Sequence, residues 1–129
     1  MKLLLDSHAV YWSLYEPERL PGGVSAVIED SSNNIFVSHV CVWELVDKAA
    51  KFRLPVAGTS VDRIVERIFG LRATMVPVAL EDIVASAKLP QHHGDPMDRV
   101  LIAQAARLGA RLLSKDRKFA LYGVDVFWP

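Results

Sequence analysis

The stretch KLLLDSH, residues 2–8, is an apolar run that ends abruptly in polar side chains. Such a run, bounded by Asp6 and Ser7, is typical of a buried β-strand that stops at a polar tip. The segment RLLSKD, residues 111–116, has the same pattern, with Asp116 two residues beyond the expected strand. An acidic side chain therefore follows each of two expected buried strands.

The rest of the chain alternates between short apolar runs and segments whose apolar residues have helical spacing. Strands are expected at residues 2–5, 35–37, 73–78, 111–114 and 124–127. Helices are expected at residues 8–15, 24–30, 39 to about 52, 61–69, 80–87 and 96–108. Strands that alternate with helices predict an α/β, three-layer domain with a mainly parallel five-stranded sheet flanked by helices.

Length and composition favour one folded domain, residues 1–129, with 51% hydrophobic and 23% charged residues. Values of this kind exclude a disordered chain. Cys41 is the single cysteine, so a disulfide within the chain is impossible, and a small buried residue in a reducing compartment is expected. Apolar runs are too short for a membrane span or a signal peptide, so we expect a cytoplasmic protein.

Charge is balanced overall but unevenly distributed. Fifteen basic and fifteen acidic residues cancel, which excludes a strongly basic nucleic-acid coat but not a local basic patch. Residues 1–43 carry two basic and five acidic side chains, whereas residues 91–129 carry six basic and four acidic ones. Contact with a polyanion is therefore expected in the later part of the chain.

Four acidic side chains are candidates for chemistry. Asp6 and Asp116 follow strands, Asp98 lies in the first turn of the helix expected from residue 96, and Glu44 lies in the second turn of another helix. Reactive groups of parallel sheets gather at the carboxyl ends of the strands, so the four acids are expected at one edge. Crowded carboxylates require protonation or a cation. Their oxygens suit Mg²⁺ or Mn²⁺, which activates water and neutralises charge on a phosphodiester.

Each acid also has a purely structural interpretation. Asp6 is suited to cap the following helix, and Asp98 suits the positive end of a helix dipole. Glu44 and Lys48 are spaced as a surface ion pair on a helix, worth about 0.3–0.5 kcal/mol. Asp116 is suited to start a turn. The joint placement of the four acids, rather than any one of them, favours a functional site.

Four segments of the chain carry a resemblance to a known family. They are LLLDSHA at residues 3–9; Ser38, then WEL at residues 43–45, Lys48 and RLP at residues 53–55; HGDPMDR at residues 93–99 with LIAQA at residues 101–105; and LSKD at residues 113–116 with Phe119 and YGV at residues 122–124. In this order, over nearly the whole chain, they resemble PIN-domain ribonucleases. The nearest group is the small toxins of VapBC-type toxin–antitoxin pairs.

This resemblance implies a magnesium-dependent endoribonuclease, or one that uses manganese, that is held silent by a small antitoxin protein encoded upstream. The acidic cluster would be Asp6, Glu44, Asp98 and Asp116, all as catalytic residues and metal ligands. Ser114 would support the metal site, and Asp95 is interpreted as a loop or cap residue. Three basic residues beside the fourth acid are expected to bind RNA phosphate: Lys115, Arg117 and Lys118.

Two other functions remain open on the residues alone. One is a degenerate PIN fold that binds RNA or protein without catalysis, although the complete set of four acids argues against it. The other is a phosphohydrolase with Asp6 as a covalent nucleophile. The best-known hydrolase of that sort has a second aspartate two residues later, where this chain has His8. The chain contains no glycine-rich phosphate loop or dinucleotide fingerprint.

Histidines and aromatic residues are assigned mainly structural roles. We expect His8 to pack at a helix start, and His92 and His93 to lie in an exposed loop. A set of aromatic residues is expected in the core or at an interface: Tyr11, Trp12, Trp43, Phe119 and Trp128. The apolar composition and the candidate exposed residues Trp12 and Tyr15 predict a homodimer with a groove for an antitoxin segment.

Overall fold

The computed structural model describes residues 1–51, 60–92 and 94–129. They form a five-stranded sheet in the order β3-β2-β1-β4-β5, and every neighbouring pair of strands is parallel. The expected parallel sheet is therefore confirmed. The strands are β1 (Lys2–Leu5), β2 (Asn34–Ser38), β3 (Thr74–Val76), β4 (Arg111–Leu113) and β5 (Val126–Phe127).

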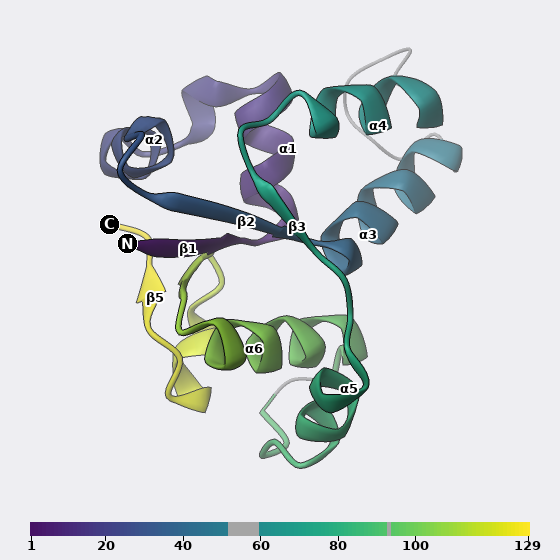
Figure 1. Ribbon diagram of the computed structural model, residues 1–129, viewed down its shortest axis with the longest axis vertical. Coiled ribbons are helices and arrows are strands. Elements are labelled where there is room, and N and C mark those ends of the chain that lie inside the picture. Colours follow the sequence, from purple (N-terminus) through teal and green to yellow (C-terminus); the bar gives the residue numbers. More distant parts are fainter. Residues whose placement is uncertain (52–59, 93) are drawn as a thin grey trace.

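Helices cover both faces of this sheet. Figure 1 shows α1, α2 and α4 on one side and α5 and α6 on the other, with α3 beyond the end of β2. The three-layer α/β architecture is thus confirmed. The helices are α1 (Ser7–Tyr15), α2 (Gly22–Glu29), α3 (His39–Ala50), α4 (Val61–Phe69), α5 (Leu80–Ala87) and α6 (Pro96–Leu108), with short 3₁₀ segments η1 (Pro17–Arg19) and η2 (Arg117–Tyr122).

Differences from the expected elements lie at their ends. The helix expected to reach about residue 52 ends at Ala50, and residues 52–59 lie outside the described part of the chain. The third and fifth strands are shorter than expected: the third ends at Val76, before Pro77, which has no backbone N–H to donate, and the fifth begins only at Val126. The two 3₁₀ segments were not predicted, since short turns of this kind lack a periodic apolar signal.

The centre of the core is formed by β1 and β4. Leu3, Leu4, Leu112 and Leu113 have no exposed surface, and Leu5 is 1% exposed. A parallel strand covered by helices on both faces needs apolar side chains in both directions, which explains the uninterrupted leucine runs. Polar residues begin where these strands leave the core.

The strand order makes β1 and β4 the switch point of the sheet. The chain leaves β1 toward β2 and β3 on one side and returns to β4 on the other. Connections on the two sides diverge there, leaving a crevice outside the carboxyl ends of the strands. Asp6 and Ser114 are the first residues after β1 and β4 and lie at this crevice.

Two further features agree with the sequence. Cys41 is 1% exposed, and burial raises the pKa of its thiol. Gly109 ends α6 with a φ of 64°, a left-handed conformation that glycine adopts without strain. Across the described ranges, we find no helix with the length and apolar character that crossing a membrane requires.

Candidate active site

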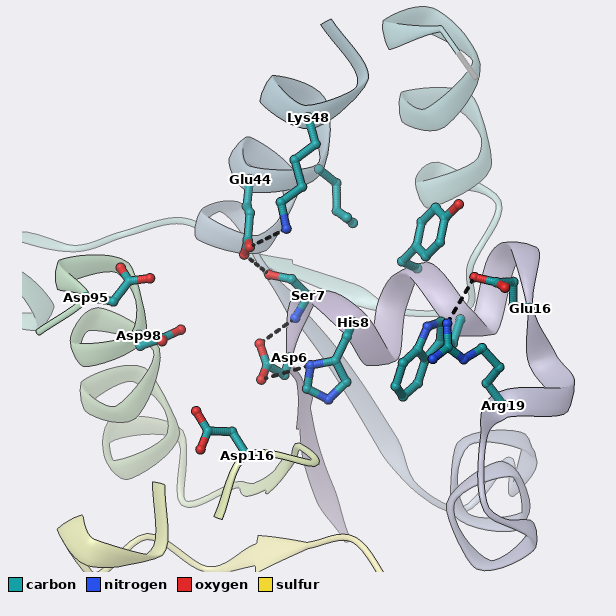
Figure 2. Close-up of a pocket in the computed structure, with 13 residues that line it drawn as sticks. Asp6, Ser7, His8, Glu16, Arg19, Glu44, Lys48, Asp95, Asp98 and Asp116 are labelled. Atoms are coloured by element: carbon teal, nitrogen blue, oxygen red, sulfur yellow. Dashed lines mark hydrogen bonds and ion pairs between the residues drawn. The ribbon is translucent and has the colours of Figure 1, made fainter. Parts of the chain in front are cut away.

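A cavity of about 420 Å³ opens at the carboxyl ends of β1 and β4. All four predicted acids line it: Asp6, Glu44, Asp98 and Asp116. Figure 2 shows their side chains around one space, although they come from the end of β1, from α3, from α6 and from the segment after β4. The structure thus brings together the residues that the sequence singled out.

Asp6 is the most enclosed of these carboxylates. Its Oδ1 accepts the backbone N–H of Ser7 at 2.6 Å, and its Oδ2 accepts the Ser114 hydroxyl at 2.7 Å. Asp6 is 7% exposed and Ser114 is 1% exposed. Asp6 also caps α1, so the structural interpretation holds as well, and capping fixes the carboxylate at the cavity wall.

Burial raises the pKa of Asp6, and the nearby Glu44 carboxylate adds to this effect. His8 and the hydrogen bonds from Ser114 and Ser7 oppose the shift without cancelling it. The folded protein therefore holds a proton on Asp6 more tightly than the unfolded chain does. An ionised Asp6 opposes folding above its raised pKa.

Glu44 reaches the cavity from the second turn of α3. Ser38 caps this helix through its hydroxyl, which accepts the Val40 N–H at 3.1 Å. The Ser7 hydroxyl donates to Glu44 Oε2, and Lys48 Nζ lies 3.0 Å from Glu44 Oε1. The predicted Glu44–Lys48 pair therefore exists, but it forms part of the cavity wall rather than an isolated surface contact.

Asp98 is held in place by the way α6 begins. The Asp95 carboxylate accepts the Met97 N–H at 2.9 Å, and Pro96 occupies the first helical position. Asp95 was predicted as a cap, and it also lines the cavity. The neighbouring Arg99 donates to the carbonyl oxygens of Ser86, Leu89 and Pro90 at 2.8–2.9 Å, which fixes α6 against the end of α5.

Asp116 lies in the segment that connects β4 to η2. Its backbone N–H donates to the Ser114 hydroxyl at 3.0 Å, and its Oδ1 accepts the Lys118 N–H at 2.9 Å. The same Ser114 hydroxyl donates to Asp6, so one buried serine connects the first and fourth acids. This contact places Ser114 where the sequence predicted a supporting residue.

The oxygen-rich donor set fits a hard divalent cation. Four carboxylates around one partly desolvated space match the ligands that Mg²⁺ and Mn²⁺ prefer. Over residues 1–51, 60–92 and 94–129, however, no three histidine, cysteine or acidic side chains stand close enough together to hold an ion as placed. Glu44 is engaged by Ser7 and Lys48, so coordination by this carboxylate requires it to turn.

Basic residues differ in their placement. Lys115, Arg117 and Lys118 are exposed and are not among the described residues that line the cavity. Arg19 and Lys48 line it instead. Arg19 of η1 lies over the Trp12 ring of α1, with its guanidinium carbon 4.5 Å from the ring centroid, a contact that the sequence analysis did not predict.

Aromatic residues also depart from expectation. Trp12 and Tyr15 are half-buried against the core, so the prediction that they are exposed is wrong. Trp43 is 64% exposed and therefore lies outside the core. Tyr11 and Phe119 are buried, as expected.

The predicted histidine positions have two outcomes. His8 packs against Trp12 at the start of α1, as expected, and it also lines the cavity. His92 is exposed, whereas His93 lies outside the described residues.

The fold and the site define an α/β domain with a carboxylate-lined cavity at the switch point of a parallel sheet. The chain belongs to the PIN domain family, whose family model matches residues 3–124. It is 31% identical over 118 residues to Ribonuclease VapC22 of Mycobacterium tuberculosis (strain ATCC 25618 / H37Rv), a match that covers 90% of this chain and 88% of that protein.

Solved structures share the fold at lower identity. VapBC2 from Rickettsia felis, bound to a DNA fragment from its promoter, has a TM-score of 0.76 at 15% identity and full coverage of both chains. VapC20 of Mycobacterium tuberculosis, described as a Sarcin-Ricin loop cleaving toxin, has a TM-score of 0.69 at 12% identity. That match covers 98% of this chain and 99% of the other.

Asp6→Asn should leave the fold intact and, without a divalent metal, leave the melting temperature unchanged or higher. The substitution removes a carboxyl group whose ionisation is disfavoured by burial, and the Oδ1 atom of Asn still accepts a hydrogen bond. Mg²⁺ should raise the melting temperature of the natural protein but not that of the variant. Thermal unfolding with and without Mg²⁺ measures both effects. A variant that unfolds would show that Asp6 is purely structural.

Proposed function

We propose that this protein is a metal-dependent endoribonuclease and the toxin of a type II toxin–antitoxin module that acts in the cytoplasm. The observation that carries the proposal is the convergence of Asp6, Glu44, Asp98 and Asp116 on one cavity. Ribonuclease VapC22, which is 31% identical over most of both chains, supports the same activity.

The acids are proposed to hold Mg²⁺ or Mn²⁺. When bound, the cation supplies an activated water and neutralises charge on the phosphodiester. Asp6, Asp98 and Asp116 would provide carboxylate oxygens, and Glu44 would do so after leaving Lys48. Cleavage by water would leave a 5′-phosphate and a 3′-hydroxyl, whereas attack by the ribose 2′-hydroxyl would leave a cyclic phosphate.

Other functions fit the cavity less well. A covalent role for Asp6 is less well supported, because His8 stands two residues later, where the best-known hydrolase of that sort has a second aspartate. A non-catalytic binding module does not require a buried carboxylate, such as Asp6, that opposes folding when ionised. Retaining such a destabilised carboxylate is typical of a functional site.

RNA binding is proposed to involve two groups of cations. Arg19 and Lys48 lie on the cavity wall, close to where a scissile phosphate would sit. Lys115, Arg117 and Lys118 lie outside it along the chain segment that carries Asp116. The exposed group would therefore contact phosphates that flank the cleavage point.

An antitoxin protein is proposed as the inhibitor. Solved structures of similar fold include VapBC2 from Rickettsia felis and a toxin–antitoxin complex from Klebsiella pneumoniae, which supports a protein partner. A basic side chain of that partner would be attracted to the acidic cavity, where a charge-assisted hydrogen bond to a carboxylate would compete with the metal.

A homodimer is proposed on a different surface from the one the sequence suggested. A groove of about 390 Å³ runs between α3, α5 and α6, with Trp43, Ile83 and Met97 in its lining. Ile83 is 51% exposed, and Leu80 beside it is 77% exposed. A second copy would cover this apolar surface, which is otherwise unfavourable in water.

RNA cleavage should disappear in excess EDTA and return when Mg²⁺ or Mn²⁺ is added, because no other described group in the cavity is assigned to activate water. Asp98→Asn should abolish cleavage, whereas the exposed Asp62→Asn should not. Gel assays of a labelled RNA measure both. Activity that survives the chelator, or an Asp98→Asn variant that cuts at the natural rate, would contradict the metal mechanism.

Replacing Lys115, Arg117 and Lys118 with Gln should weaken RNA binding and reduce its salt dependence. Each lost phosphate contact should lower the slope of log K against log salt by about 0.7 for a single strand. Filter binding over a salt series measures the slope.

The matched control replaces three exposed basic residues that do not line the cavity, Lys51, Arg63 and Lys88. The control should retain the natural slope. Equal slopes for the two triple variants would remove the basic patch from the account.

Ile83→Lys should convert a dimer to a monomer, because it places a charge in the apolar groove. Phe69→Lys, on an exposed apolar residue of α4 outside that groove, should leave the dimer intact. Light scattering coupled to size exclusion measures the mass. A natural protein that is monomeric at high micromolar concentration would refute the dimer.

A further inference from the structure

His8 connects the two ends of the acidic site through both of its ring nitrogens. Its Nε2 accepts the backbone N–H of Lys115 at 3.0 Å. Its Nδ1 lies 3.4 Å from Asp6 Oδ2. The imidazole therefore lies between the first acid and the residue that immediately precedes the fourth acid, Asp116, as the stick view in Figure 2 illustrates for Asp6 and His8.

The contact with Lys115 determines the tautomer of the ring. A nitrogen that accepts an N–H carries no proton, so Nε2 is unprotonated. The neutral ring then carries its proton on Nδ1, which faces the Asp6 carboxylate. With its Nε2 lone pair engaged by a backbone amide, this histidine is not available as a general base.

Two indole rings fix the orientation of the imidazole. The Trp12 centroid lies 5.1 Å from the His8 centroid, and the Trp128 centroid lies 5.5 Å from it. Trp12 and Trp128 also contact each other, with centroids 5.9 Å apart. A ring flanked in this way loses little further freedom when it accepts the hydrogen bond from Lys115.

His8 extends the pairing of β1 with β4 beyond the sheet. The Asp6 N–H donates to the Leu113 carbonyl at 3.0 Å as the last backbone link. The Ser114 hydroxyl donates to the Asp6 carboxylate, and the Lys115 N–H donates to His8. Three successive contacts thus hold the two segments in register after their strands have ended.

We propose that His8 is a positioning residue that holds the Lys115–Asp116 segment beside Asp6, so that Asp6 and Asp116 can share a cation. The inference rests on the proposed function, because it assigns Asp6 and Asp116 to one metal. The role differs from helix packing, since the hydrogen bond that Nε2 accepts from Lys115 and the contact of Nδ1 with Asp6, rather than the volume of the ring, hold the segment in place.

Three substitutions of His8 distinguish the contributions of its two ring nitrogens. Gln at position 8 extends an amide oxygen to about the position of Nε2 and can accept from Lys115. Asn reaches only the position of Nδ1, and Ala reaches neither. His92→Gln, on an exposed loop histidine that does not line the cavity, is the matched control.

The primary measurement is the affinity for Mn²⁺ alone, without RNA, by electron paramagnetic resonance of the free ion. His8→Ala and His8→Asn should weaken binding about 10-fold or more, the loss typical of residues that orient metal ligands. His8→Gln should stay within about threefold of the natural protein, a smaller loss than that range. Melting temperatures without metal should be similar for the Asn and Gln variants.

Two results of the Mn²⁺ measurement would overturn the proposal. One is that His8→Ala binds Mn²⁺ as tightly as the natural protein, and the other is that His8→Gln binds it as weakly as His8→Ala. Nitrogen-15 NMR of the His8 ring gives a readout independent of metal, and a proton on Nε2 in the natural protein would also overturn it. If the natural protein binds Mn²⁺ but cuts no RNA, the proposed function fails, whereas the order of Mn²⁺ affinities still decides the role of His8.

Discussion

The parallel pairing of β1 with β4 is the constraint on which the rest of the structure depends. Leucines fill both faces of the two strands, so neither strand can slide or turn without exposing core side chains. The first polar residue after each strand must therefore emerge at the same place. Asp6 and Ser114 meet there, and the serine hydroxyl donates to a carboxylate that burial makes costly to ionise. The stability of the core holds this unfavourable group in position.

The chemistry follows from how the other acids reach the same space. Glu44, Asp98 and Asp116 each come from a capped element whose first residues are fixed by hydrogen bonds. Such caps fix the backbone from which each carboxylate reaches the cavity. A divalent cation bound among the four carboxylates would be attracted to all of them, so binding of the metal would stabilise the folded protein.

Much of this arrangement could be predicted from the sequence, because apolar runs and caps are local signals. The leucine runs predicted β1 and β4, and Ser38 and Pro96 predicted where α3 and α6 begin. Contacts between side chains of different elements were not predictable in the same way. Arg19 reaches the cavity across the Trp12 ring, and the Lys115 amide meets His8, and neither leaves a periodic pattern. Exposure of Trp43 rather than Trp12 depends on which helix face the neighbouring helices leave open.

Anomalous scattering from a crystal soaked in Mn²⁺ tests the central claim, that these carboxylates share a cation, most directly. The account predicts a manganese peak in the cavity with an Asp6 oxygen about 2.1 Å away, and oxygens of Asp98 and Asp116 in the same coordination sphere. A well-ordered cavity without a peak, or a peak bound by other residues while Asp6 keeps its hydrogen bonds to Ser7 and Ser114, would contradict it.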